Sequence, residues 1–185
     1  MAYFPAYIQL KNKNILIIGG GKIAYEKLKH LLDFSQNITI IAKNHNKKLQ
    51  SLANKHHLKV FTKAYQNDDI KECDIVIIAV DDISLQETIY NQTRDTRVLC
   101  NAVDSVKFCD FIFPSYIKQG DLIISVSTSG ASPSVAKYLR RHIQNLIPED
   151  LNIFLDKMKT LRVSLPKGKK RMKLLDKKAK KYFKE

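Results

Sequence analysis

The stretch ILIIGGGKIAYEKLKHLL, Ile15 to Leu32, decides the fold of this chain. It starts with four apolar residues, which are typical of a strand buried on both faces. Three glycines follow, and after them the apolar residues recur at helical spacing through Leu32. The stretch therefore predicts a strand, a tight turn and a helix in direct succession.

The glycine turn fits the pattern G-x-G-x-x-A at Gly19, Gly21 and Ala24. In such a turn one glycine permits the sharp bend, the next lets backbone amides approach a pyrophosphate, and the small third residue lets the helix pack on the strand. The helix N-terminus, at Lys22 and Ile23, would add partial positive charge. A glycine turn without a ligand is the alternative, but the flanking strand and helix favour dinucleotide binding.

Strands and helices continue to alternate over the residues that follow. Apolar runs predict further strands at 37–42, 58–65, 73–80 and 97–103, with helical patterns behind the first and third of them. This alternation indicates an α/β fold with a doubly wound parallel sheet.

The pattern changes at Phe113-Pro114. Residues 115–126 predict a hairpin that turns at Gln119-Gly120-Asp121. A helix with Ser132 as N-cap and a proline at its first position follows. Beyond Pro148 we expect two short helices, separated at residues 166–168.

The formal net charge of +14 is concentrated at the end of the chain. Residues 1–136 carry 16 Lys and Arg against 13 Asp and Glu, whereas residues 137–185 carry 16 against 5. Nucleic acid phosphates, an anionic membrane surface or a small substrate with many carboxylates would each fit this charge.

The composition also indicates the cellular compartment and excludes some classes of protein. No apolar run approaches the roughly 20 residues that cross a bilayer, and the chain opens without a signal-peptide pattern. The three cysteines show no C-x-x-C spacing, and the five histidines are scattered. We therefore expect a reduced, soluble, cytoplasmic protein without disulfides and with no metal site of its own.

The adenosine end of a dinucleotide is expected past the second strand, at Lys43 and Asn44. An Asp or Glu usually accepts hydrogen bonds from the ribose hydroxyls there, and this chain has neither. Asn44 is suited to ribose hydroxyls and Lys43 to a 2′-phosphate. The residues alone leave NAD and NADP both open.

Two later strands end in polar residues that we expect at the same crevice, because the carboxyl ends of parallel strands line it. Val80 and Asp81 would lie near the cofactor; alternatively, Asp81 and Asp82 cap the next helix. Asn101 and Asp104 follow the last strand, where a carboxylate is placed to exchange a proton with a bound substrate. Asp104 is therefore the candidate general acid/base and Asn101 the positioning residue, against the alternative of an ordinary loop turn.

A second anion site is indicated at the helix that Ser132 caps. Hydroxyls and free backbone amides at a helix start suit carboxylates or phosphates. An ordinary capped helix with a solvated basic face is the alternative. The candidate substrate-binding residues are Ser127, Thr128, Ser132, Lys137 and Arg140.

The segments ILIIGGGKIAYEK, CDIVIIAVDD and the run from Cys100 to Ile143, in this order, resemble the precorrin-2 dehydrogenase / sirohydrochlorin ferrochelatase family, the amino-terminal module of siroheme synthases. The resemblance spans residues 3–150 and is most specific from Asn101 to Arg141.

The resemblance implies a Rossmann-type oxidoreductase that converts precorrin-2 to sirohydrochlorin with NAD. Some members then insert ferrous iron, a lyase activity that gives siroheme. Asp104 would be the catalytic aspartate of both steps, and Gly19, Gly21 and the Asp81 region would bind the cofactor. The family is a homodimer whose intersubunit contact comes from the region after Pro114.

This reading divides the chain into an NAD-binding Rossmann domain at 1–113, a small α+β dimerisation and substrate region at 114–148, and a basic helical tail at 149–185. On this reading the excess of lysine and arginine binds the carboxylates of a tetrapyrrole. We expect neither nucleic acid nor a membrane as a partner. A regulatory NAD(H)-binding module that docks to nucleic acid through its tail is the alternative, although no helix-turn-helix or aromatic stacking platform is visible.

Overall fold

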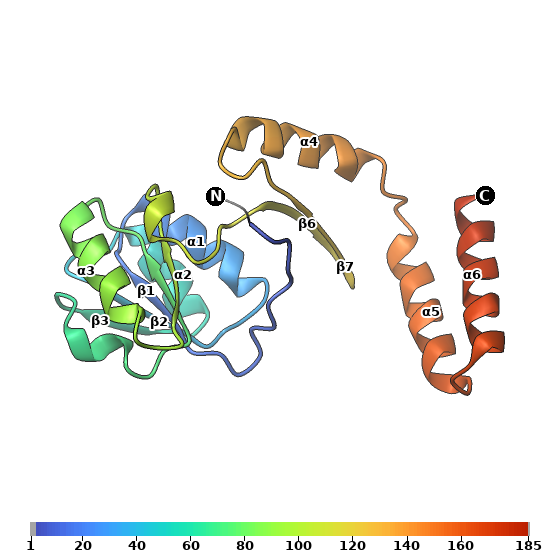
Figure 1. Ribbon diagram of the computed structural model, residues 1–185, viewed down its shortest axis with the longest axis horizontal. Helices are drawn as coiled ribbons and strands as arrows, with labels where there is room; N and C mark the ends of the chain where they lie inside the picture. The colour runs from blue at the N-terminus through green and yellow to red at the C-terminus, as the bar shows by residue number, and fades with distance from the viewer. Residues whose placement is uncertain (1–2, 185) are drawn as a thin grey trace. The chain divides into compact units, whose positions relative to one another are not determined.

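The computed structural model describes residues 3–184 and contains two compact units, one up to Phe113 and one from Pro114 on (Figure 1).

The first unit is built on a five-stranded parallel sheet with the strand order β3-β2-β1-β4-β5. The chain starts in the middle of the sheet, adds two strands on one side, and returns to add two on the other. The predicted doubly wound sheet is confirmed. The strands are β1 (Ile15–Ile18), β2 (Ile38–Ala42), β3 (Lys59–Thr62), β4 (Ile75–Ile78) and β5 (Leu99–Ala102).

The central strands β1 and β4 are covered on both faces, which explains why they are apolar throughout. Ile15 and Ile17 point into a core closed by α1 and α2, whereas Leu16 and Ile18 point into a second core on the opposite face. The elements on the first face are α1 (Lys22–Leu32) and α2 (Lys47–Lys55). Those on the second are α3 (Ile83–Thr93) and the 3₁₀ turns η1 (Asn67–Ile70) and η2 (Val106–Phe108).

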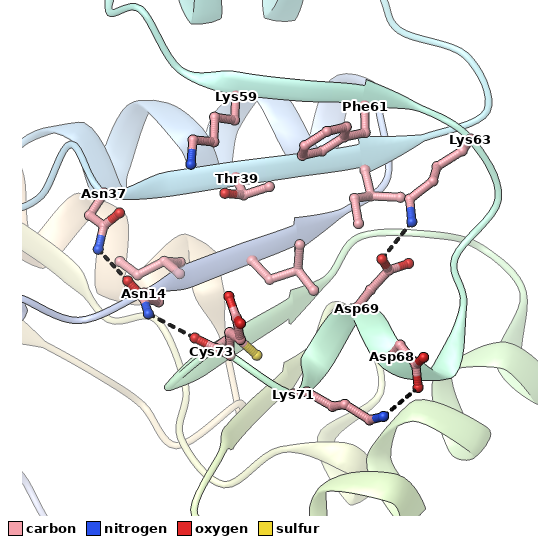
Figure 2. A pocket seen from close by; sticks show the side chains of 14 residues that line it. Asn14, Asn37, Thr39, Lys59, Phe61, Lys63, Asp68, Asp69, Lys71 and Cys73 are labelled. Atoms are coloured by element: carbon pink, nitrogen blue, oxygen red, sulfur yellow. Dashed lines mark hydrogen bonds and ion pairs between the residues drawn. The ribbon is translucent and has the colours of Figure 1, made fainter.

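The crossover between β3 and β4 carries only the single turn η1 instead of a full helix. Part of the sheet face beside β3 is therefore left without a helical cover. Figure 2 shows the resulting hollow, which is lined by side chains such as Thr39, Lys59 and Phe61.

The second unit starts with an antiparallel hairpin of β6 (Ser115–Gln119) and β7 (Leu122–Val126), as predicted. Gly120 makes the turn with a φ of +58°. Helix α4 (Pro133–Asn145) packs on both strands and is capped by Ser132, whose Oγ accepts a hydrogen bond from the Val135 N–H at 3.3 Å.

The predicted helical tail is present as α5 (Leu151–Ser164) and α6 (Lys169–Phe183). The Phe154 and Tyr182 rings stack with their centroids 4.1 Å apart, and the Tyr182 hydroxyl donates to Asp150 at 2.6 Å. These contacts pair the two helices. Over residues 3–184, no helix combines the length and the apolar character that a membrane span requires.

Candidate active site

The carboxyl ends of β1, β2, β4 and β5 meet at one edge of the first unit. This edge includes the point between β1 and β4 where the strand order reverses, which is the usual ligand crevice of doubly wound sheets. The segments that follow the four strands are Gly19–Gly21, Lys43–Asn44, Val80–Asp82 and Val103–Asp104.

The glycine turn is fixed by close backbone packing. Gly19 has a φ of +124°, and a Cβ there would collide with the carbonyl oxygen of Ala79. A Cβ on Gly20 would collide with the Asn44 carbonyl oxygen, and the Gly20 carbonyl accepts a hydrogen bond from the Asn46 N–H at 2.9 Å. Sequence reasoning gave Gly20 no role, because the motif treats its position as free. Two of the three glycines thus join the ends of β1, β2 and β4.

Gly21 has a different environment. It is exposed, a Cβ on it would meet nothing within 4 Å, and it caps α1 without a side-chain hydrogen bond. The Lys22 and Ile23 N–H groups, in the first turn of α1, have no hydrogen-bond partner among residues 3–184, and Ala24 is buried beneath them. Free amides at a helix start form a cradle suited to the pyrophosphate of a dinucleotide.

A hollow of about 600 Å³ lies beyond the end of β2. The side chains of His45 and Thr62 meet in its lining, with Nε2 and Oγ1 3.1 Å apart. Lys43 and Asn44 are exposed at its rim, and no carboxylate is part of the lining. The hollow stands where the adenosine end of a dinucleotide was expected. The complete lining is Lys43, Asn44, His45, Lys47, Gln50, Ser51, Asn54 and Thr62.

The two aspartates after β4 have different environments. Asp82 caps α3, because its Oδ1 accepts a hydrogen bond from the Leu85 N–H at 3.0 Å. Asp81 is exposed and is not the cap. The Val80 carbonyl accepts a hydrogen bond at 2.7 Å from Nε2 of Gln86, a buried residue that sequence reasoning missed. Val80 and Asp81 are thereby held at the crevice edge.

Asp104 stands at the tip of the turn after β5. It is exposed and has a φ of +63°, a left-handed conformation that is uncommon outside glycine. The turn is tied to the sheet because the Val103 N–H donates to the Ile78 carbonyl at 2.9 Å. An accessible carboxylate on such a turn is placed to exchange a proton with a ligand in the crevice.

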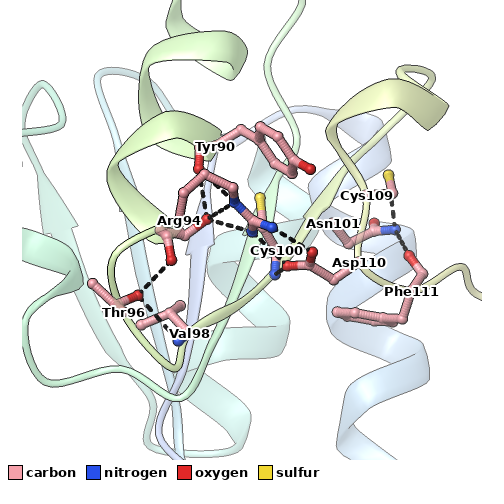
Figure 3. A network of polar contacts seen from close by, with 10 residues as sticks. Tyr90, Arg94, Thr96, Val98, Cys100, Asn101, Cys109, Asp110 and Phe111 are labelled. Atoms are coloured by element: carbon pink, nitrogen blue, oxygen red, sulfur yellow. Dashed lines mark hydrogen bonds and ion pairs between the residues drawn. The ribbon is translucent and has the colours of Figure 1, made fainter.

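Asn101 is buried, with 5% of its surface exposed. Its Nδ2 donates to the Phe111 carbonyl at 2.8 Å and lies 3.5 Å from the Cys109 Sγ, as Figure 3 shows. The side chain thus holds the segment that returns after the Asp104 turn. Its predicted role of positioning a substrate stays a prediction, and what the geometry supports is positioning of the loop.

A charged network that sequence reasoning missed anchors the same loop (Figure 3). The Arg94 guanidinium donates to both Asp110 oxygens, at 2.8 and 2.7 Å, and Asp110 also accepts the Cys100 N–H at 2.8 Å. Burial acts to raise the pKa of Asp110, but the hydrogen bonds from Arg94 and Cys100 outweigh it and hold this pKa below its ordinary value. The Arg94 guanidinium also lies over the Tyr90 ring, 3.9 Å from its centroid.

In the second unit, the predicted substrate-binding hydroxyls bond to their own loop. Thr128 Oγ1 donates to the Ser132 carbonyl and accepts from the Ser132 N–H, both at 3.0 Å. Ser127 Oγ accepts from the Ser129 N–H at 3.0 Å. Arg140 donates to Gln144 at 2.6 Å, and Lys137 is exposed. The role of Ser132 as N-cap of α4 accounts for a serine at this position without any ligand. Substrate binding by these five residues stays a prediction.

The hollow in Figure 2 does not compete with the crevice as an active site. Two of the cations along it are already paired, Lys63 with Asp69 at 2.6 Å and Lys71 with Asp68 at 2.9 Å. Across residues 3–184, no three His, Cys, Asp or Glu side chains come together as a metal site. The crevice combines the first turn of α1, which has no side-chain cap, with the exposed carboxylate of Asp104.

Comparisons with known proteins agree with this fold. A family described as putative NAD(P)-binding matches residues 6–115, and one described as sirohaem biosynthesis protein central matches residues 119–146. The siroheme synthase of Nitrosococcus oceani is 35% identical over 80% of this chain and 32% of its own length. That of Pseudoalteromonas atlantica is 32% identical over 83% of this chain and 33% of its own length. The chain thus spans about a third of the length of these curated relatives.

A solved structure titled SirC, precorrin-2 dehydrogenase, superposes with a TM-score of 0.80. It covers 95% of this chain and 88% of its own, at 22% sequence identity. At this identity the likeness establishes a common fold.

Proposed function

The chain belongs to the family of putative NAD(P)-binding proteins whose model matches residues 6–115, and from this premise, together with its siroheme synthase relatives, we propose that it oxidises precorrin-2 to sirohydrochlorin with NAD. The observation that carries the proposal is the pairing of two features at one sheet edge. The open, uncapped start of α1 follows β1, and the accessible carboxylate of Asp104 follows β5. A hydride acceptor and a proton acceptor are what this dehydrogenation requires.

Bound NAD supplies a nicotinamide ring that accepts the hydride. The backbone at Gly21 and the first turn of α1, from Lys22 to Ala24, would hold the pyrophosphate. Asn44 would bind the ribose hydroxyls at the hollow beyond β2. Val80 and Asp81 would line the crevice on the nicotinamide side.

Asp104 would accept the proton that the substrate loses along with its hydride. Loss of both balances the reaction, because precorrin-2 becomes sirohydrochlorin while NAD becomes NADH and one proton is released. The left-handed turn projects the carboxylate outward, and Asn101 fixes the returning segment behind it. A carboxylate is a competent general base when it is held within hydrogen-bond reach of the departing proton.

The second unit would contribute to substrate binding and assembly. We propose that Ser127, Thr128, Ser132, Lys137 and Arg140 bind carboxylates of the tetrapyrrole, supported by the basic character of α4. Helix α4 also exposes a stripe of apolar side chains, which we propose as the surface of a homodimer. The stripe comprises Val135, Tyr138, Leu139 and Leu146.

Two further parts of the proposal follow from the same residues. Ferrous iron would be a second substrate, with Asp104 taking the pyrrole protons, since a metal binds only deprotonated nitrogen. The three free cysteines suit a reducing compartment, so we propose the cytoplasm as the site of the reaction. The alternative, a regulatory module that docks to nucleic acid, is not favoured, because the relatives are siroheme synthases.

The proposal is tested by anaerobic incubation of the protein with precorrin-2 and NAD, followed by absorbance spectroscopy. NADH and sirohydrochlorin are expected to appear in equal amounts. Addition of ferrous iron is expected to convert the spectrum to that of siroheme. A protein that binds NAD but leaves precorrin-2 unchanged would exclude the proposed activity.

A further inference from the structure

Helix α1 carries a lysine, Lys27, at a partly buried position where an apolar residue is usual. Its buried residues are Ala24, Leu28 and Leu31, which follow the stripe of an amphipathic helix. Lys27 lies on the same side of the helix, three residues after Ala24 and next to Leu28, and it is half-buried. A charged residue in such a stripe is destabilising unless its ammonium group finds partners.

The surroundings of Lys27 include the loop that carries Asp104. Its Nζ lies 4.1 Å from the centroid of the Phe113 ring. Phe113 packs against Phe111, whose carbonyl is held by Asn101. Desolvation by burial lowers the pKa of Lys27, and the nearby Asp104 and Cys109 act in the opposite direction. Asp104 thus partly offsets the effect of burial on the pKa of this lysine.

Lys27 nevertheless has no carboxylate partner among residues 3–184. No Asp or Glu oxygen lies within 4.0 Å of its Nζ, which instead contacts the face of the Phe113 ring. A ring face attracts the ammonium charge without satisfying its three N–H donors. A partly desolvated ammonium with free donors is the group that a ligand carboxylate stabilises.

We propose that Lys27 forms a subsite for one carboxylate of the tetrapyrrole beside Asp104. This inference rests on the proposed function and adds to it the residue that orients the ring. One carboxylate held at Lys27 would fix which ring carbon faces the general base. Fixing a substrate in this way contributes to catalysis through orientation.

Two other roles for Lys27 make different predictions. As a structural residue, its aliphatic stem would only cover Phe113, and an apolar replacement would leave ligand binding unchanged. As a positioning residue, it would act through the charge of Asp104, and its effect would vanish once that charge is removed.

The test is an absorbance titration of the protein with sirohydrochlorin, together with the KM and kcat for precorrin-2. For Lys27→Met, Kd and KM are expected to rise about 10- to 100-fold, the range of a charge-assisted hydrogen bond, and kcat is expected to fall because the ring is no longer oriented toward the general base. Lys27→Arg should recover most of the affinity. The matched control is Lys29→Met, which removes an exposed lysine of the same helix and should bind like the wild type.

A second pair of variants separates direct binding from action through Asp104. In the Asp104→Asn background, Lys27→Met should weaken sirohydrochlorin binding by the same factor as in the wild type. Loss of the effect in that background would overturn the proposal. Thermal melts establish that each variant is folded, and Lys27→Gln replaces Lys27→Met if the latter does not fold.

The possible outcomes distinguish failure of the Lys27 subsite from failure of the proposed function. Wild-type protein that oxidises precorrin-2, with a folded Lys27→Met that titrates normally, contradicts the subsite alone. Protein that binds sirohydrochlorin through Lys27 but produces no NADH contradicts the proposed activity and leaves the subsite standing. Wild-type protein that does not bind sirohydrochlorin contradicts both.

Discussion

Gly19 lies against the carbonyl of Ala79 so closely that any side chain at Gly19 would collide with it. Gly19 also has a φ of +124°, which residues with a Cβ rarely adopt. We predict that Gly19→Ala destabilises the protein by about 3 kcal/mol, because strain and displacement of the β4 end add together. Urea unfolding followed by circular dichroism measures this loss.

The control for Gly19→Ala is Gly130→Ala. Gly130 has a φ of +89°, but a Cβ there meets nothing within 4 Å. Its substitution should cost about 1 kcal/mol, the conformational part alone. Equal losses at the two positions would contradict the close packing of Gly19 on Ala79.

Gly21→Asp should separate cofactor binding from stability. Asp is a good N-cap, so the fold is expected to be as stable as the wild type or slightly more stable. The carboxylate would repel the pyrophosphate and occupy the α1 amides, so NAD binding should weaken at least about tenfold. Fluorescence titration with NADH measures this, and an unchanged titration in the folded variant would place the cofactor elsewhere.

Most of the fold was predictable because its signals are local. The apolar run at Ile15–Ile18 and the glycine turn after it specify a buried strand and a helix start without help from distant residues. The hairpin at Gly120 and the N-cap at Ser132 are likewise encoded within a few residues. The short η1 crossover was not predicted, because its single turn leaves no periodic pattern in the sequence.

Asp110 should make the free energy of unfolding depend on pH in the acidic range. Its pKa is held below the ordinary value of about 4, so its ionised form stabilises the fold above that pH, and the stabilisation is lost as the pH falls through the lowered pKa. We predict that Asp110→Asn costs about 1 kcal/mol at pH 7, a value discounted for partial exposure of the pair. The difference from the wild type should shrink below about pH 4.

The control for the acid effect is Asp68→Asn. Asp68 also has a lowered pKa, through a hydrogen bond with Lys71, but the pair is exposed. Its removal should leave unfolding unchanged at both pH values. If Asp110→Asn behaved in the same way, the network with Arg94 and Cys100 would not be a stabilising element of this loop.

The Cys100 thiol should be unreactive toward thiol reagents in the folded protein. Burial is the main cause that raises the pKa of its thiol to about 12, and the side chain is fully covered. Little thiolate exists at pH 8, so a disulfide reagent should modify Cys100 only after unfolding. The measurement is a timed reaction of the Cys73→Ser, Cys109→Ser variant with and without guanidinium. Rapid modification without denaturant would contradict the buried β5.

The residues of the candidate site that directly follow a strand could be predicted from the sequence. Those whose role depends on tertiary contacts could not. The position of Asp104 follows from its place after the last strand, since parallel strands end at one edge. Gln86 and Arg94 gave no such signal, because their importance comes from hydrogen bonds to the Val80 carbonyl and to Asp110 that no short sequence pattern encodes. Lys27 gave none because a lysine does not mark the partly buried position that it occupies.

The role of Asp104 as proton acceptor is the central claim, and NADH formation from precorrin-2 under anaerobic conditions tests it most directly. Wild-type protein should produce NADH, and Asp104→Asn should lower kcat at least about 100-fold, the usual contribution of a general base. NADH binding and thermal stability of the variant should match the wild type, because the side chain is exposed. Turnover near the wild-type rate in folded Asp104→Asn would contradict the account.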